Sequence, residues 1–394
     1  MGGIQDRQPN GGSLKSFTGR FFLRAPTASQ RTMNRKSRQK KNVLIYRLGS
    51  LGDTIVALPC FHRIRRSFPD ALITLLTNMP MDGRAAAAEQ ILGSSGLVDD
   101  VVSYPVGTRM PGELLRLVRT IRNHEIHTMV YLAASRGKAA VLRDRLFFHF
   151  CGIKTIHGLP VSDRDFRVML DPHTGLYEHE SLRLSRRITS LGPVDLEGKG
   201  MWDLLLDPVE ITFGESFTRE FRGGPFVAVS LGTKMQSKDW GLDNWKSLLE
   251  ELSREIPDHG LLLLGSGEEF DVSSRASSCW TGKVVNLCGK ANPREVSAAL
   301  RHAAVFIGHD SGPMHLAAAI GIPCVAVFSS RGLPGHWFPH GTGHRIIYHR
   351  TDCQGCNLTV CVAQGKKCIL SISVREVLDA ILAVLNRTAT PVTP

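Results

Sequence analysis

Eight short apolar runs, separated by longer segments with helical spacing, constrain the fold more than any other feature of the sequence. The clearest are "NVLIY" (42–46) and "FVAVSLG" (226–232). Near-continuous apolar strands are typical of parallel sheets that are covered by helices on both faces. The other expected strands are 71–77, 128–133, 261–265, 283–289, 304–308 and 324–328. The sequence therefore predicts an α/β fold.

The apolar runs form two blocks, which predicts two Rossmann-like doubly wound domains. The first domain spans 42–205 and the second spans 225–370. Between them, 206–224 loses the alternation of strand and helix and ends in a Gly-Gly-Pro turn, which indicates a linker. A final helix is expected at 371–388. Ligands of open α/β sheets bind at the carboxyl ends of the strands, so the site should lie in a cleft between the domains.

The charge is concentrated in the first 41 residues. Residues 1–41 hold ten Lys/Arg and one acid, so 10 − 1 = +9 of the net +12 lies there. The remainder contributes 12 − 9 = +3, which removes most support for a nucleic-acid partner. This leader has the composition of a disordered segment. Three interpretations of this leader are open. It is a solvated tail, it precedes the true initiator Met33 and is not translated, or it contacts anionic lipid.

No apolar run reaches the roughly 18 residues of a membrane span.

The segment "RLGSLGDTIVALP" (47–59) places a glycine-rich turn between a strand and a helix. Such turns usually hold phosphate, but this one carries a carboxylate, Asp53, which would repel it. Asp53 is either a general base that faces a leaving group in the other domain or a cap of the following helix. The acceptor side of the cleft is expected to be formed by the rest of this loop, Arg47, Gly49, Ser50 and Gly52.

Two loops of the second block carry groups suited to a nucleotide. Thr233 and Lys238 follow the strand 226–232, and a hydroxyl with a lysine charge suits a diphosphate. A solvated loop is the alternative. Glu268 and Glu269 follow the strand 261–265 and would either bind ribose hydroxyls or stabilise a helix dipole.

The most informative segment of the second block is "VFIGHDSGPMHLAAAIGIP" (305–323). Asp310, Ser311 and Gly312 open a helix that carries His315 in its first turn. Backbone N–H groups at a helix start, with a serine hydroxyl, can hold a phosphate, and glycine permits close approach of a ligand. A capped helix with a surface histidine is the alternative.

These stretches together resemble glycosyltransferase family 9, the ADP-heptose:lipopolysaccharide heptosyltransferases. The resemblance covers about 42–387. It implies a GT-B architecture, whose final helix crosses back to brace the first domain. It also implies an inverting, cofactor-independent transfer of heptose from ADP-heptose to a lipid-linked saccharide of the lipopolysaccharide inner core. The implied location is the cytoplasm, with peripheral contact at the inner membrane.

The resemblance also assigns roles to residues. Asp53 corresponds to the catalytic base, Lys238 to a lysine that binds the diphosphate, and Thr233 to a neighbouring phosphate contact. The other implied donor-binding positions are Glu268, Glu269, Leu287, Asp310, Ser311, Gly312 and His315.

Four cysteines near the end of the chain follow the pattern C-x2-C-x4-C-x6-C: Cys353, Cys356, Cys361 and Cys368. The first pair suits a structural zinc or iron. Reduced thiols are the main alternative, and disulfides are disfavoured in the cytoplasm.

Two other functional classes remain open at this stage. One is another enzyme of the same fold that uses a different nucleotide sugar or acceptor, including a protein, or that epimerises a nucleotide sugar. The other is a non-enzymatic binder of anionic surfaces or of nucleic acid that works through the leader.

Overall fold

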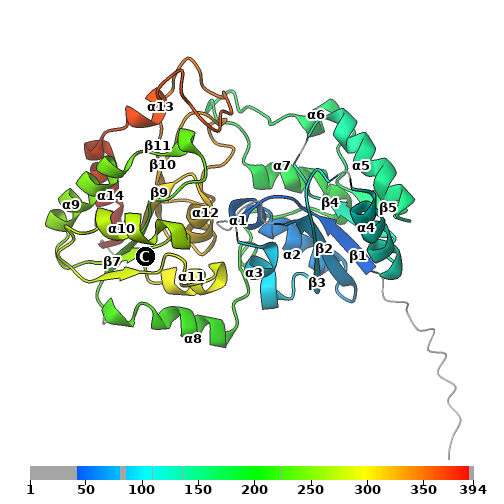
Figure 1. Cartoon of the computed structure of the whole chain (residues 1–394), viewed down its shortest axis with the longest axis horizontal. Helices are drawn as coiled ribbons and strands as arrows, with labels where there is room; N and C mark the ends of the chain where they lie inside the picture. The colour runs from blue at the N-terminus through cyan, green and yellow to red at the C-terminus, as the bar shows by residue number, and fades with distance from the viewer. Residues whose placement is uncertain (1–41, 80–85, 109, 135, 222, 390–394) are drawn as a thin grey trace, which may run out of the picture. The chain divides into compact units, whose positions relative to one another are not determined.

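The computed structural model describes residues 42–79, 86–108, 110–134, 136–221 and 223–389 (Figure 1). The leader lies outside the described residues. Two parallel sheets organise the chain, one of five strands and one of six. The predicted α/β class with two Rossmann-like domains is confirmed.

The first sheet has the order β3-β2-β1-β4-β5. Alternate residues of β1 face opposite sides: Val43 and Ile45 pack under α2 and α7, whereas Leu44 and Tyr46 pack under α4 and α5. Its strands are β1 (Asn42–Tyr46), β2 (Leu72–Asn78), β3 (Asp100–Tyr104), β4 (Thr128–Tyr131) and β5 (Thr155–His157). Its helices are α1 (Leu51–Ile55), α2 (Leu58–Ser67), α3 (Ala88–Leu92), α4 (Pro111–Asn123), α5 (Lys138–Phe150), α6 (Asp163–Phe166) and α7 (Glu180–Arg187).

The second sheet has the order β11-β10-β9-β6-β7-β8. Val227 and Val229 of β6 face one apolar cluster, and Phe226 and Ala228 face another. Its strands are β6 (Phe226–Ser230), β7 (Gly260–Leu263), β8 (Val284–Asn286), β9 (Val305–His309), β10 (Cys324–Val327) and β11 (Arg345–Ile347). The helices of this half are α9 (Leu242–Glu255), α10 (Phe270–Ala276), α11 (Pro293–Leu300), α12 (Gly312–Ala319), α13 (Lys367–Leu370) and α14 (Val374–Ala389).

Both sheets reverse their strand order at one point. In the first sheet the reversal lies between β1 and β4, and in the second between β6 and β9. Ligands of doubly wound sheets bind outside the carboxyl ends of the strands at such a reversal. The loops that follow β1, β6 and β9 therefore start at the two places where a site is expected.

All eight predicted strands are present, and no strand end differs from its predicted position by more than three residues. Three strands were missed, and each is the outer strand at an edge of its sheet: β3, β5 and β11. Most residues of their sequences, "DVVSY", "TIH" and "RII", are only half-buried. An edge strand needs no continuous apolar run, so the pattern that revealed the central strands is weak there.

The final helix differs from the expectation that it packs back on the first domain. Val377, Leu378, Ile381 and Val384 of α14 instead join the apolar cluster formed by α9 and the second sheet. The reason is that this face of the second sheet carries Val227 and its neighbours, which the apolar stripe of α14 helps to cover.

The expected linker contains a helix, α8 (Pro208–Ser216). It is capped by Asp207, whose carboxylate accepts a hydrogen bond from the backbone N–H of Glu210 at 2.8 Å. Gly214 lies so close to α11 that a methyl group added there would meet the Ala298 side chain. The expected linker thus packs, through α8, against α11 of the second domain.

Candidate functional site

Lys238 and Asp310 form an ion pair of 2.6 Å between the loops that follow β6 and β9. The Lys238 ammonium also donates to the backbone carbonyl of Asp310 at 3.2 Å. Both side chains are about 15% exposed. The predicted diphosphate lysine and the predicted helix start therefore lie together at the reversal point of the second sheet.

Asp53 caps the short helix α1. Its Oδ2 accepts a hydrogen bond from the Ser50 backbone N–H at 2.8 Å and a longer one from the Ser50 hydroxyl. Asp53 is therefore not the residue in front of the helix, as the capping alternative assumed, but the third residue of α1, where one carboxylate oxygen completes a capping box with Ser50. The side chain remains 30% exposed, so Asp53 keeps access to solvent and to a ligand.

Arg47 supports the Asp53 loop from beneath. It was expected to face the acceptor, but the side chain is only 2% exposed because it lies under the loop. It donates to the Asp53 carbonyl at 2.6 Å and to the Leu132 carbonyl at 2.8 Å. Its guanidinium lies 3.7 Å from the Asp53 carboxylate. Arg47 therefore holds the loop in place and does not present a charge to an acceptor.

The Asp53 loop touches the start of α12, so loops that follow strands of the first and the second sheet meet at this point. A methyl group added to Gly52 would lie 2.9 Å from Cδ2 of His315. A methyl group added to Gly312 would lie 2.9 Å from the Leu51 Cβ. Both glycines are required by this close approach, which puts the Asp53 loop beside the helix that carries the predicted donor-binding residues.

His315 is buried, contrary to the surface histidine considered as an alternative. Its ring lies edge-on to Trp337 at 5.9 Å. Burial lowers the pKa of His315 to about 4, although the Asp310 charge acts in the opposite direction. The ring is therefore neutral near pH 7, and it can offer one N–H donor and one acceptor without adding charge.

The start of α12 carries a buried hydroxyl. Ser311 is the N-cap residue of the helix, yet its side chain makes no capping hydrogen bond. Its Oγ is buried and finds no hydrogen-bond partner within the described ranges. A buried polar atom without a partner is destabilising, so this hydroxyl fits a site that a ligand completes.

The two predicted glutamates differ in position. Glu269 accepts a hydrogen bond from the Ser266 backbone N–H at 2.7 Å, and its carboxylate lies directly against Gly232, beside Thr233. Glu268 is exposed. Glu269 thus belongs to the same group of loops as Thr233 and Lys238.

Leu287 does not present its side chain to a ligand. It is 3% exposed and packs in the core under the second sheet. Only the backbone of this segment could line a base.

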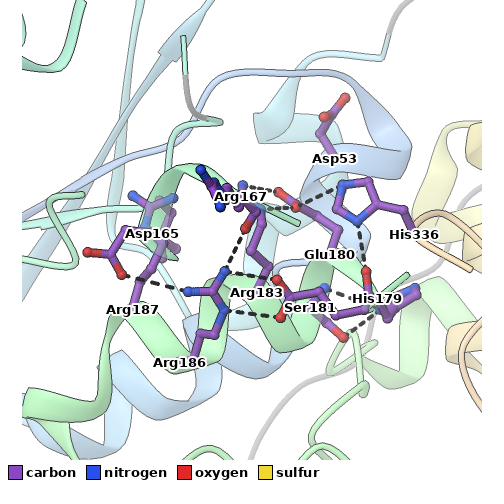
Figure 2. Close-up of polar contacts among 12 residues, drawn as sticks. Asp53, Asp165, Arg167, His179, Glu180, Ser181, Arg183, Arg186, Arg187 and His336 are labelled. Atoms are coloured by element: carbon purple, nitrogen blue, oxygen red, sulfur yellow. Dashed lines mark hydrogen bonds and ion pairs between the residues drawn. The ribbon is translucent and has the colours of Figure 1, made fainter. Parts of the chain in front are cut away.

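A buried ionic network beside Asp53 was not identified from the sequence (Figure 2). Glu180 lies 3.5 Å from Arg47 and forms two hydrogen bonds with Arg183, at 2.6 and 2.8 Å. It also lies 3.4 Å from Nε2 of His336 in the second half of the chain. The spacing of three between Glu180 and Arg183 was the available signal, because it places the two side chains on one helix face.

The four C-terminal cysteines line one small cavity together with Arg331 and Lys367. All four carry free thiols, and Cys361 and Cys368 are buried. Among the residues that the structure describes, no three metal-binding side chains are arranged to hold a metal ion. The residues as placed therefore do not fit a zinc or iron centre.

The described part of the chain contains no helix long and apolar enough to cross a membrane.

Together these groups could support transfer between two substrates. The partly exposed Asp53 carboxylate lies on a loop that contacts the start of α12, and the Lys238–Asp310 pair and the Ser311 hydroxyl, which has no partner among the described residues, lie at that helix start. Cations and helix N-termini stabilise negative charge on a leaving group, and a carboxylate can remove a proton from a hydroxyl.

Comparison with known families gives one match over most of the chain. The family model described as "Glycosyltransferase family 9 (heptosyltransferase)" matches residues 115–367, which is more than half of the sequence.

Individual relatives agree with this match. Lipopolysaccharide heptosyltransferase 3 of Escherichia coli K12 is 21% identical over 306 residues, covering 71% of this chain and 80% of the relative. The structure of E. coli ADP-heptose lipopolysaccharide heptosyltransferase II has a TM-score of 0.63 at 16% identity, covering 89% of this chain and all of that one. The iron-containing dodecameric glycosyltransferase TibC of enterotoxigenic E. coli has a TM-score of 0.50 at 15% identity, covering 89% of this chain and 77% of that one. The structural likenesses support the fold.

Proposed function

Because this chain belongs to glycosyltransferase family 9, we propose that it transfers a heptose from ADP-heptose to a saccharide acceptor of the lipopolysaccharide core. One observation carries the proposal: the Asp53 loop touches the start of α12, next to the Lys238–Asp310 pair. A carboxylate and a cation are thereby held close to the reversal points of two sheets, where ligands of such sheets bind.

On this proposal Asp53 is the general base. Its carboxylate takes the proton from an acceptor hydroxyl, and that oxygen attacks the anomeric carbon of the heptose. The bond from this carbon to the diphosphate breaks, and ADP leaves with the electron pair. Attack from the face opposite ADP inverts the configuration.

The donor side would stabilise the leaving group. Lys238 exchanges part of its contact with Asp310 for the diphosphate, and the α12 N-terminus with the Ser311 hydroxyl adds donors. Thr233 and Glu269 lie on neighbouring loops, where they can contact phosphate and ribose. The backbone near Leu287 would line the adenine.

The acceptor is proposed to be a lipid-linked saccharide at the cytoplasmic face of the inner membrane. The support is the family and the basic character of residues 1–41. Such a leader is attracted to anionic lipid, with each basic residue contributing about 1 kcal/mol near the surface.

We also propose that the four cysteines are reduced thiols that pack the C-terminal segment against the second domain. Iron is present in TibC, but the cysteines here are not arranged as metal ligands in the described structure. Catalysis is proposed to need no cofactor.

A thermal-shift panel tests the donor assignment. ADP-heptose and UDP-, GDP- and CMP-sugars are compared on the full chain and on Asp53→Asn. A ligand at 100 times its Kd stabilises a protein by about 2.7 kcal/mol. We expect only ADP-heptose to raise Tm, and to do so equally in both proteins.

Acceptor dependence then separates the transferase from an epimerase. ADP release should require the saccharide acceptor. Conversion of the nucleotide sugar without acceptor, or stabilisation by a different nucleotide sugar, would reject the proposed reaction.

A further inference from the structure

An exposed apolar stripe runs along α5 in the first domain. Leu142, Leu146 and Phe150 are 56%, 63% and 62% exposed. They are spaced by four residues, so they lie on one face of the helix. The opposite face of the helix packs against the domain, since Val141, Asp144 and Phe148 are buried. The stripe is therefore not part of the core of this domain.

Cations border the stripe on both sides. Arg145 lies on one edge and Arg143 on the other, at the positions given by helical spacing, and Arg143 pairs with the Asp144 carboxylate at 2.9 Å. Arg122 of α4 lies over the Phe150 ring, 5.1 Å from its centre, and donates to the Phe150 carbonyl at 2.7 Å. The first residue of the helix, Lys138, pairs with Asp163.

The one acidic residue of α5 is turned inward. Asp144 accepts hydrogen bonds from Tyr131 at 2.8 Å and from Arg136 at 2.6 Å. It is 7% exposed. The face that holds the stripe therefore combines apolar side chains with arginines and presents no carboxylate from its own helix.

We propose that this face of α5 docks the enzyme on an anionic lipid surface. Helices that lie in a membrane interface pair an apolar stripe with flanking Lys and Arg. Leu142, Leu146 and Phe150 would enter the acyl boundary, and Arg122 and Arg145 would meet lipid phosphates. The inference deepens the proposed function, on which it rests, because it identifies the surface that brings the enzyme to a lipid-linked acceptor.

Charge favours lipid over the two other candidate occupants. A second copy docked through the same face would place arginines against arginines. The leader carries +9 over residues 1–41, so it would be repelled as well. An anionic surface is the partner that matches both the apolar stripe and its border.

Vesicle binding tests the docking face in the full chain. Vesicles of phosphatidylcholine with phosphatidylglycerol are compared with phosphatidylcholine alone, using wild type, Leu146→Glu and Val209→Glu. Val209 of α8 is 76% exposed and serves as the matched control. Leu146→Glu should weaken binding to anionic vesicles about tenfold, whereas Val209→Glu should bind like wild type.

A second measurement separates docking by α5 from docking by the leader. Leu146→Trp and Val209→Trp are mixed with anionic vesicles that contain brominated lipid, which quenches nearby tryptophan. Extra quenching is expected for Leu146→Trp alone. Binding without that quenching, or no binding of wild type, overturns the proposal. A change from dimer to monomer in Leu146→Glu would instead show a contact between copies and also overturn it.

An activity measurement distinguishes failure of the docking proposal from failure of the proposed reaction. Leu146→Glu should retain wild-type turnover on a lipid-free saccharide acceptor, because the residue lies outside the proposed site. If wild type transfers no heptose, the proposed function fails while the vesicle result still stands.

Discussion

The residues of the candidate site combine local and long-range roles. Asp53 caps α1 through one carboxylate oxygen and remains partly exposed, and Lys238 is held by Asp310. Each group is therefore already oriented by a neighbour. Pre-orientation of this kind lowers the cost of arranging groups in a transition state.

Replacement of Asp53 separates its two roles. Asn keeps an oxygen that can accept the Ser50 N–H, but it cannot take a proton. Asp53→Asn should lower kcat by about 10²- to 10⁴-fold and leave Tm and donor affinity near wild type. The measurement is steady-state turnover with a donor-binding titration, and near-normal turnover would reject the base.

Loss of the Lys238 charge should weaken binding of the donor. A hydrogen bond to a charged group is worth about 1.5–3 kcal/mol. Lys238→Ala should therefore weaken binding of ADP about 10- to 100-fold in a calorimetric titration. Lys246→Ala, at an exposed position of α9, removes the same charge elsewhere and should bind ADP normally; equal losses in both variants would point to a general charge effect.

At the scale of elements, α1 and α12 can approach only because each carries a glycine at the contact. Gly52 faces His315 and Gly312 faces Leu51. This contact joins the loop after the first strand of one sheet to the loop after β9 of the other.

A methyl group at Gly312 should disturb this contact. Gly312→Ala would place Cβ 2.9 Å from the Leu51 Cβ, and such overpacking costs about 1–3 kcal/mol. We expect a lower Tm and a lower turnover. Gly112→Ala on α4 is the control, because a methyl group there meets nothing within 4 Å. Unchanged turnover in Gly312→Ala would mean that the two helices can separate without loss.

The cysteine segment makes a prediction of its own. If the cluster consists of thiols, purified protein should contain less than about a tenth of an equivalent of zinc or iron, and a denatured sample should titrate nine thiols. Elemental analysis and thiol titration check this. About one equivalent of metal would reverse the thiol proposal.

At the scale of the whole chain, buried ion pairs connect distant segments. Glu180 meets Arg47, Arg183 and His336. Arg294 of α11, which is 3% exposed, pairs with Glu210 and donates to backbone carbonyls that include Leu204 at 2.9 Å. These contacts place charged groups where the two halves of the chain meet.

The pKa values of the two glutamates predict acid sensitivity. Burial alone would raise the pKa of Glu180, but Arg183 and Arg47 hold it at about 2. Hydrogen bonds from Arg294 lower the pKa of Glu210 to about 2. Because both folded-state values lie below the ordinary value near 4.5, their stabilising contribution is present above that pH and is lost as the pH falls toward about 2.

Tm measured against pH tests this linkage. Glu180→Gln should lower Tm at pH 7, since leaving a buried charge unpaired costs about 3–5 kcal/mol, and should show a smaller fall in Tm between about pH 4.5 and 2. Glu113→Gln removes a partly exposed pair with Arg116 and should change little. An unaltered pH profile in Glu180→Gln would assign the acid sensitivity to other groups.

The sequence by itself determined the central strands and the two-domain organisation, and it predicted candidate site residues in the loops that follow those strands. Continuous apolar runs such as 226–232 reveal buried strands, because a strand covered on both faces must be apolar throughout. Asp53, Lys238 and the segment from Asp310 to His315 follow such strands. Parallel strands end at a common edge, so the local pattern sufficed to place these residues near a site.

Only the tertiary structure decided which side chains are buried and what they meet. Arg47 lies under its loop, Leu287 points into the core, and α14 covers the second domain. The Glu180–His336 contact joins residues that are far apart in the chain. Burial and ion pairing of this kind depend on how separate elements pack, and no local periodicity carries that information.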